Sequence, residues 1–476
     1  MSVIFDISET GKNQYLPGKA LCSDTDPIPA KFLNDGIDLP DVNEVEVVRH
    51  YTRLSQMNYG VDSGMYPLGS CTMKYNPKIN EKLSALENFS KMHPLTGDNF
   101  SQGSLQIMHE LSNMLSVITG MPGISLWPSA GAHGELTAVM IMKKYFEEKG
   151  ENRKTILIPD SAHGTNPASV TLCGYNVVTV PSTAEGDVDI SKLKELISPD
   201  IAGMMLTSPN TLGLFDRNIL QISEILKQNG SLFYGDGANF NAVIGTAKMS
   251  DMGFDLIHLN LHKTFSTPHG GGGPGSGPIG VAEYLIKYLP VPIIEFKDGK
   301  YLLKSDYPDT IGRIHSFYGN FLVYLKAYIY ISALGAEGIR EISRNSVLNA
   351  NYLLAKLGRE FNVPIKRSCM HEFIINDKGL PNNVTTNEIA KRLLDYGFHA
   401  PTVYFPLIID GAMMIEPTET ESKDSLDSFF NAMVKIKKEI FETPEVVKNA
   451  PQNTPVRRVD AVTAARKPVL KWQKQN

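Results

Sequence analysis

A lysine and an aspartate at the ends of two successive apolar runs could carry out chemistry together. Lys263 follows the apolar residues 256–261, has a histidine on either side and precedes a loop of small residues. Asp236 ends the apolar run before that, with room for one further connection and strand between them. An enzyme that uses pyridoxal phosphate (PLP) needs a lysine amine for the Schiff base and an aspartate for the pyridinium nitrogen. The pair therefore predicts a PLP enzyme, although Lys263 alone would be interpreted as a solvated surface lysine.

The composition excludes several classes of protein. The chain has 476 residues, 42% hydrophobic and 20% charged, which indicates two or three folded domains. A net charge of −5 gives no electrostatic case for nucleic acid as a partner. The apolar residues 317–334 are interrupted by Gly319, Asn320 and Lys326, so we expect no membrane span. The N-terminus has neither the basic region nor the apolar core of a signal peptide.

The cysteines favour a reducing compartment. There are four of them and none forms a CxxC pair: Cys22, Cys71, Cys173 and Cys369. This pattern indicates neither a zinc site nor a disulfide framework, so we expect no metal and a cytoplasmic location.

The middle of the chain alternates between strand and helix patterns. Helical spacing predicts helices over residues 102–119 and 131–148 and, further on, over 190–197 and 217–228. Short apolar runs predict strands at 155–159, 177–180, 202–207, 232–235 and 256–259. Runs that are apolar on both faces and separated by helices are typical of a parallel sheet covered on both sides. The predicted fold class is thus α/β, and Asp236, His262 and Lys263 fall at strand ends, where such sheets bind ligands.

The pattern changes on either side of this region. Residues 1–75 form a predicted N-terminal arm with one helix around 42–57, followed by a large domain over 76–315. A smaller α+β domain is predicted over 316–450, with helices at 320–346, 387–394 and 425–441 and strands at 373–376 and 413–416. Residues 451–476 form a tail that is either solvated or a docking segment. Its six basic side chains stand against one acid, Asp460, and are Arg457, Arg458, Arg466, Lys467, Lys471 and Lys474.

Several motifs together resemble the glycine dehydrogenase (decarboxylating) family, the P-protein of the glycine cleavage system, in its shorter two-subunit form as the second subunit. They are the lysine stretch, Tyr66-Pro-Leu-Gly-Ser-Cys-Thr-Met-Lys-Tyr-Asn-Pro77, Ser129-Ala-Gly-Ala-His-Gly-Glu135, Ser161-Ala-His-Gly-Thr-Asn-Pro167, Asp236-Gly-Ala-Asn239 and Ala465-Arg-Lys-Pro-Val-Leu-Lys-Trp472. The resemblance implies the aspartate aminotransferase-like fold of PLP-dependent transferases (fold type I). His133 matches the two-chain form, since single-chain members usually carry glutamine there.

The residues receive the following expected roles. Lys263 would bind PLP covalently, Asp236 would keep the ring nitrogen protonated, and the resemblance assigns His163 to the ring face. The small-residue loop of Ala130, Gly131, Ala132 and His133 opens a predicted helix and could cradle the phosphate. Thr207 and Ser208 end a strand and are candidates for the cofactor hydroxyl, Asn239 lies in the aspartate motif, and His262 would contact phosphate or substrate.

Each role has a plainer alternative. Asp236 could be a turn aspartate, His163 a polar loop histidine, and the small-residue loop merely a site of tight packing. The glycine-rich residues 270–277 lack P-loop spacing and favour a close approach to the cofactor or to a partner subunit. Arg313 is equally an anion clamp or an ordinary surface arginine. For Cys71, a buried inert thiol is favoured over a reactive thiol at the mouth of the site.

The resemblance implies a complete reaction. Glycine would be decarboxylated on PLP, and the aminomethyl group would pass to the lipoyl arm of H-protein, without NAD or metal. The implied partner is a homologous subunit 1 (alpha chain), in a two-plus-two heterotetramer. Two alternatives stay open: another PLP enzyme of this fold, such as an amino-acid decarboxylase or cysteine desulfurase, or a catalytically silent subunit. Lys263 together with Asp236 argues against the second.

Overall fold

The computed structural model describes residues 3–9, 29–32, 39–269, 273 and 275–473 of the chain. Some residues named above lie outside the described residues: Cys22, Lys474 and the glycine-loop residues Gly270, Gly271, Gly272 and Pro274. The chain divides into two units, Met1–Gly60 with Asn453–Asn476, and Val61–Gln452. The domain boundaries expected from the sequence stay predictions.

The first unit combines the two ends of the chain. Its main helix, α1 (Glu44–Gln56), begins at Asn43, whose side chain accepts a hydrogen bond from the Glu46 amide while Glu46 returns one to the Asn43 amide. This capping box stabilises the first turn and explains the helix expected around residues 42–57. Near the ends, Trp472 stacks on Phe5 with 4.8 Å between ring centroids. The described remainder is η1 (Ile4–Ile7), η2 (Ala30–Phe32) and α13 (Ala461–Arg466).

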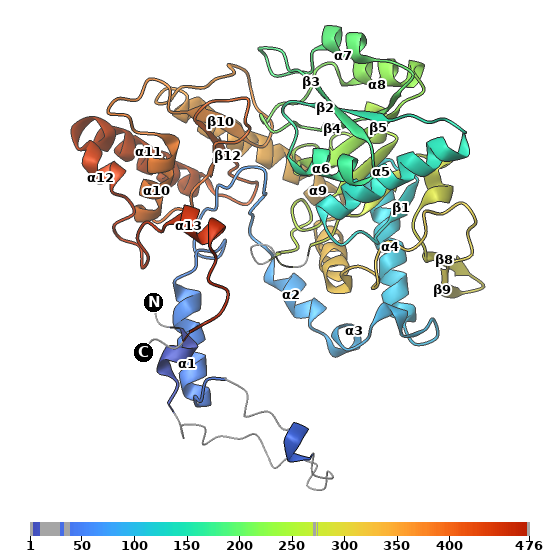
Figure 1. Ribbon diagram of the computed structural model, residues 1–476, viewed down its shortest axis with the longest axis horizontal. Coiled ribbons are helices and arrows are strands. Elements are labelled where there is room, and N and C mark those ends of the chain that lie inside the picture. The colour runs from blue at the N-terminus through green and yellow to red at the C-terminus, as the bar shows by residue number, and fades with distance from the viewer. Residues whose placement is uncertain (1–2, 10–28, 33–38, 270–272, 274, 474–476) are drawn as a thin grey trace. The chain divides into compact units, whose positions relative to one another are not determined.

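The second unit contains a large sheet (Figure 1), whose seven strands lie in the order β1-β7-β6-β5-β4-β2-β3. The strands are β1 (Gly123–Ser125), β2 (Thr155–Pro159), β3 (Asn176–Val180), β4 (Ile201–Thr207), β5 (Leu232–Gly237), β6 (Leu256–Leu259) and β7 (Ile279–Val281). Strands β2 to β6 pair in parallel, as expected from their apolar runs. Strand β7 is antiparallel to both its neighbours and, like β1, is too short to give a pattern in the sequence.

Helices cover both faces of this sheet because its strands bury alternate side chains on opposite sides. Ile156 and Ile158 of β2 join the core with α5 (Gly131–Glu148) and α6 (Thr165–Leu172). Leu157 joins the other core, with α4 (Gln102–Thr119), α7 (Ile190–Leu196), α8 (Ile219–Gln228) and the first half of α9. The parallel sheet covered on both sides is confirmed, with β7 as the antiparallel exception.

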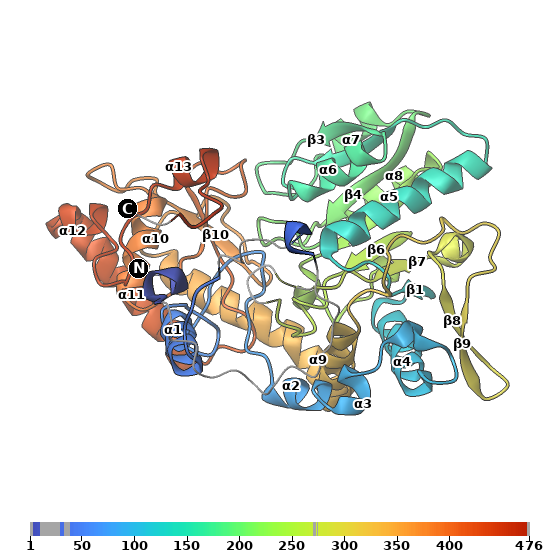
Figure 2. The same ribbon diagram turned by 60° about the horizontal axis from the view of Figure 1, so that its bottom comes forward.

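Smaller elements complete this part of the chain. The hairpin of β8 (Ile293–Lys297) and β9 (Lys300–Lys304) packs on α4 and projects from the sheet (Figure 2). The other elements are α2 (Lys78–Ser84), α3 (Glu87–Ser90), η3 (Pro94–Thr96), η4 (Phe240–Ala242), η5 (Ser250–Met252) and η6 (Glu283–Tyr288).

The remainder of the second unit is an antiparallel sheet covered by helices. Strands β10 (Phe373–Asn376), β12 (Ala412–Ile415) and β11 (Thr402–Val403) pair in that order. They pack against α10 (Thr386–Asp395), α11 (Lys423–Glu442), α12 (Pro444–Lys448) and the end of α9 (Phe321–Leu357). The expected helices and strands are all present, and α9 runs eleven residues beyond the expected end at Ser346.

One helix differs from a sequence expectation. By length and composition α9 meets the criteria for a membrane span, although we expected no such segment. Its buried side chains belong to the two cores of the second unit, which is the usual situation of a long core helix.

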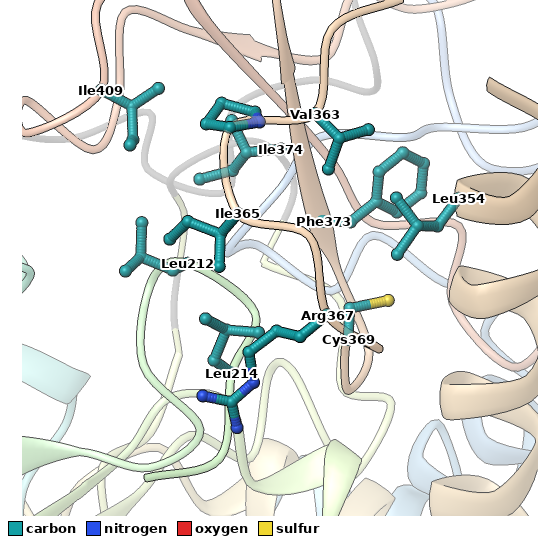
Figure 3. A pocket seen from close by; sticks show the side chains of 11 residues that line it. Leu212, Leu214, Leu354, Val363, Ile365, Arg367, Cys369, Phe373, Ile374 and Ile409 are labelled. Carbon is teal, nitrogen blue, oxygen red and sulfur yellow. The ribbon is translucent and has the colours of Figure 1, made fainter. Parts of the chain in front are cut away.

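The segment before β10 is fixed against a loop that follows β4. The Met370 amide donates to the carbonyl of Gly213 at 2.7 Å. Gly213 has a φ of 74°, and a Cβ there would collide with the backbone carbonyl of Glu372. Beside this contact, Leu212 and Leu214 face Ile374 across an apolar pocket (Figure 3). The contact fixes the position of residues 370–372, which line the site described next.

Candidate active site

The predicted site residues gather at the carboxyl ends of the parallel strands. Thr207 at the end of β4 is in register with Asp236 on β5, which is in register with His258 on β6. His163 follows β2, and Lys263 follows β6. The sheet therefore brings together side chains that are far apart in the sequence, at the edge where α/β sheets bind ligands.

Asp236 is buried and held by several donors. Its Oδ2 accepts from Asn166 Nδ2 at 3.0 Å and from the Thr207 hydroxyl at 3.5 Å. Its Oδ1 accepts from the Ala238 amide at 2.9 Å and lies 3.5 Å from His258 Nε2. These contacts fix the carboxylate in one orientation. Thr207 was expected at the cofactor hydroxyl, and none of these donors was anticipated as a partner of Asp236.

Two further titratable groups adjoin Asp236. Burial lowers the pKa of His258, so the ring is neutral, and its Nδ1 contacts the Tyr234 hydroxyl. Burial and repulsion by Asp236 raise the pKa of Glu135 to about 7. Glu135 accepts hydrogen bonds from Thr165 and Ser169, so three buried groups, not one aspartate alone, determine the charge here. Glu135 stood in a motif of the sequence, but nothing there placed it beside Asp236.

Lys263 is partly buried and its amine donates to the carbonyl of Ser70 at 2.7 Å. Burial lowers the pKa of both His163 and His258, the positive charge of Lys263 lowers both further, and Asp236 acts on both in the opposite direction. Both histidines therefore lie within the electrostatic influence of Lys263 and of Asp236. His163 itself is exposed, contacts the Thr165 hydroxyl at 3.1 Å and meets the ring of Phe405 edge-on.

His262 is a neutral hydrogen-bonding group. Burial, with Lys263 and two histidines, lowers its pKa to about 3. Its Nδ1 accepts from the Ser276 amide at 3.2 Å, and its Nε2 lies 3.3 Å from Asn260 Nδ2. Asn260 lies against Gly131, where a Cβ would meet its side chain. His262 is thus connected to the small-residue loop through Asn260.

The small-residue loop suits a phosphate. Ala130 is the N-cap of the 18-residue helix α5, and no side chain in the described residues caps that end. Ala130 and Ala132 are exposed, so the first amides of the helix are open to a ligand. His133 receives a hydrogen bond from the Ser129 amide at 3.3 Å. Free amides at a helix N-terminus favour an anion.

Orphaned polar atoms provide a test of whether PLP fits here. Asn166 Oδ1, Ser208 Oγ and Asn239 Oδ1 are buried and have no hydrogen-bond partner among the described residues. Asn166 contacts Asp236 directly, and Ser208 and Asn239 belong to the segments that follow β4 and β5. Buried polar atoms without partners are uncommon in folded proteins. The hydroxyl of PLP could donate to one of the two amide oxygens, and its phosphate or ring oxygens could accept from Ser208, so the residues present fit PLP.

Cys71 and Arg313 were the two candidates with an open role. Cys71 is partly exposed instead of buried, and desolvation raises the pKa of its thiol. Arg313 is exposed, with its guanidinium 6.0 Å from the ring centre of Trp127. Neither observation tests a role in catalysis.

Sequence reasoning missed a second group of residues beside Lys263. His371, Glu372 and Glu416 are fully buried and come from the ends of β10 and β12. No motif pointed to them, because only the pairing of the two strands brings them to the lysine.

Comparison with known proteins decides the family. Residues 342–458 match the model of the glycine dehydrogenase C-terminal domain, and residues 126–272 match aminotransferase class V. The chain is 54% identical to the probable glycine dehydrogenase (decarboxylating) subunit 2 of Caldanaerobacter subterraneus subsp. tengcongensis, over 99% of each chain. It is 51% identical to that of Bacillus licheniformis, again over 99% of each chain. The chain belongs to the glycine dehydrogenase (decarboxylating) subunit 2 family.

Solved structures confirm the fold. A crystal structure of glycine decarboxylase (P-protein) of the glycine cleavage system, in inhibitor-bound form, aligns with a TM-score of 0.73 at 20% identity, covering 86% of this chain and 93% of that one. A cysteine desulfurase from Thermococcus onnurineus aligns with a TM-score of 0.63 at 16% identity, covering 79% and 95%. The PLP-dependent transferase fold of type I is therefore confirmed, and PLP is the cofactor of this family.

Proposed function

We propose that this chain is the PLP-bearing subunit of a glycine dehydrogenase, which decarboxylates glycine and transfers the aminomethyl group to the lipoyl arm of H-protein. The observation that carries the proposal is the oriented, buried Asp236 at the same edge of the sheet as Lys263, in a chain that matches subunit 2 of glycine dehydrogenase over nearly its full length. An inert subunit has no reason to keep this pair.

The chain's residues would divide the work as follows. Bound PLP supplies an electron sink for the pair of electrons released when CO2 leaves. Asp236, fixed by Asn166 and Thr207, would hold a proton on the ring nitrogen by its negative charge. Lys263 would hold the cofactor covalently and exchange it for the glycine amine. His163 would cover the ring.

Further residues would hold the rest of the cofactor. The first amides of α5, from Gly131 to His133, would bind the phosphate, with His262 positioned through Asn260. Thr207 and Asn239 would lie near the ring hydroxyl.

The partner belongs to the same proposal. The relatives' name, subunit 2, implies a subunit 1. We infer a two-plus-two heterotetramer that works with lipoylated H-protein in the cytoplasm. The described chain offers exposed apolar side chains that a partner would cover, such as Val117 at 73% and Leu172 at 74% exposure.

The first experiment maps the cofactor. Borohydride reduction of the purified subunit 1–subunit 2 complex, followed by peptide mapping, is expected to place the pyridoxyl group on Lys263. Lys263→Ala should remove the cofactor absorbance and turnover, whereas Lys78→Ala, at an exposed lysine, should change neither. A label on any other lysine would refute the assignment.

The second experiment separates this function from other PLP chemistry. Exchange of labelled bicarbonate into the glycine carboxyl is expected to require both subunits and lipoylated H-protein. Decarboxylation that is equally fast without H-protein would instead indicate an ordinary amino-acid decarboxylase. Sulfur release from cysteine would indicate a desulfurase. Full exchange by this chain alone as a monomer or homodimer would contradict the two-subunit assignment.

A further inference from the structure

Two buried carboxyl groups face each other at the end of the small sheet. Strands β10 and β12 pair antiparallel with Phe373 opposite Ile415, so the next residues, Glu372 and Glu416, stand opposite one another where the two strands end. Both side chains are 0% exposed. Directly opposed like charges are unfavourable in a sheet, and more so when buried.

Both carboxyl groups bind one short loop. Glu372 Oε2 accepts from the Ser70 amide at 2.6 Å. Glu416 accepts from the Thr72 amide at 2.9 Å and from the Thr72 hydroxyl at 2.7 Å. Ser70 and Thr72 have φ angles of 64° and 49°, the left-handed region that is unfavourable for residues with a Cβ. The two glutamates therefore hold the loop in a conformation that it would not adopt alone.

The same loop holds the amine of Lys263. Lys263 Nζ donates to the Ser70 carbonyl, while the amide of that residue donates to Glu372. A single residue thus connects the carboxyl pair to the lysine that would carry the cofactor. The position of the Lys263 amine depends on how the pair holds the loop.

The hydrogen bonds indicate how one proton is distributed over the pair. Glu416 also accepts from Asn241 Nδ2 at 3.3 Å, so it has three donors and is suited to carry the negative charge. Glu372 Oε1 has no hydrogen-bond partner among the described residues and lies 3.6 Å from His371 Nε2. That oxygen is suited to carry the proton.

The surrounding charges agree with one net negative charge. Burial and repulsion by Glu416 raise the pKa of Glu372 well above its usual value, and burial also raises that of Glu416. Burial and Lys263 lower the pKa of His371 to about 3, so its ring is neutral. Desolvation raises the pKa of the partly exposed Cys71, which keeps it a neutral thiol. Lys263 is the cation that acts on both carboxyl groups.

Another buried ion pair adjoins these groups. Lys74 binds Glu419 at 2.6 Å, and this glutamate is a further negative neighbour of Glu416. The positive charge of Lys74 is thus already matched by Glu419, and the repulsion by Glu419 adds to the raised pKa of Glu416.

We propose that Glu372 and Glu416 form a positioning pair that shares one proton, fixes the Ser70–Thr72 loop against Lys263, and supplies one negative charge to balance the cation at Lys263. The inference rests on the proposed function only in taking Lys263 as the cofactor lysine.

The test compares glutamine variants of the holoenzyme complex by two methods. Infrared spectroscopy detects a protonated buried carboxyl group, and the pH midpoint of the cofactor absorbance reports the charge balance at Lys263. At a pH well above the pKa of about 7 at which Glu135 ionises, we expect a protonated-carboxyl band in the wild type. Glu372→Gln should remove that band and keep the midpoint within about 0.3 pH units, because Glu416 keeps its charge. Glu416→Gln should give the same two results, since Glu372 then ionises without a like-charged neighbour.

The double variant should behave differently. With both charges gone, we expect the midpoint to fall by about one pH unit or more, a tenfold change in the protonation equilibrium. Glu421→Gln is the matched control, because this glutamate also has a pKa raised by burial but accepts its hydrogen bond from Ser425. It should leave the midpoint unchanged. Glu372→Ala, which removes the acceptor for the Ser70 amide, should weaken PLP binding about tenfold or more, and the glutamine variant should restore it.

Three results would overturn the proposal. The first is a wild type without the protonated-carboxyl band. The second is a midpoint in either single glutamine variant that falls as far as in the double variant. The third is a stoichiometric divalent metal bound by His371, Glu372 and Glu416, whose ligand atoms lie within 4.8 Å of one another. A wild type that binds no PLP would refute the proposed function instead, and the infrared band would still test the carboxyl pair.

Discussion

Replacing Lys74 by methionine tests how a buried ion pair supports the site. The Lys74 side chain is 1% exposed and its amine makes three contacts: Glu419 at 2.6 Å, the Thr264 carbonyl at 2.7 Å and the Tyr330 hydroxyl at 3.1 Å. Burial alone would lower the pKa of Lys74, but Glu419 and Tyr330 outweigh it and raise the pKa. The amine is therefore charged at neutral pH.

Methionine keeps most of the length of the side chain and removes the charge. Glu419 would be left 8% exposed without its cation, and the Thr264 carbonyl would lose a donor. Removing one partner of a buried pair costs about 3–5 kcal/mol. The matched control is Lys78→Met, since Lys78 pairs with Asp62 at the same 2.6 Å but both side chains are more than half exposed. That change should cost about 1 kcal/mol or less.

Urea unfolding of both variants, in complex with the partner subunit, measures the difference. The double variant Lys74→Met/Glu419→Gln should recover part of the loss, because it no longer leaves a buried charge unpaired. A loss for Lys74→Met no greater than for Lys78→Met would refute the reasoning. It would mean that Glu419 is solvated or neutral in the folded protein.

Three further changes address the site and its supports. Asp236→Asn should keep PLP bound but lower decarboxylation by orders of magnitude; a near-normal rate would show that the ring nitrogen need not be protonated. Glu135 binds its proton more tightly when folded, so between pH 4.5 and about 7 the folded state holds more protons and stability falls as pH rises. Thermal unfolding of Glu135→Gln against pH should lack this decline, and an unchanged slope would contradict it. Gly213→Ala should lower unfolding stability by more than about 1 kcal/mol and by more than Gly299→Ala, which shares the positive φ but has open space around it; equal losses would show that the contact with Glu372 is unimportant.

The sequence predicted the elements that have a strong pattern. The helices Gln102–Thr119 and Gly131–Glu148 lie where the apolar spacing and the following stop placed them. The five parallel strands were recognisable because both faces are buried, which gives continuous apolar runs. Strands β1 and β7 were missed because three residues carry no period, and their place is set by packing.

The site was predictable in part for a similar reason. Asp236 and Thr207 follow from the rule that ligands meet the carboxyl ends of parallel strands. Glu372 and Glu416 could not be identified from the sequence, because their proximity depends on the register of an antiparallel strand pair that the sequence does not specify. His163 is placed near the charges of Lys263 and Asp236, but stacking on a ring stays a prediction.

Helix α9 links the unfolding of the two sheets of the second unit. The helix is kinked at Gly335. Tyr324 before the kink and Ile339 after it belong to one core of the seven-stranded sheet, and Leu353 and Leu357 in the last turns belong to the core of the small sheet. Both cores therefore contain buried side chains of α9. The two sheets should therefore melt in a single calorimetric transition, and proteolysis should not release either as a folded fragment. A truncation within α9 would remove buried side chains from the core that remains, so we expect neither sheet to be stable as a shorter protein.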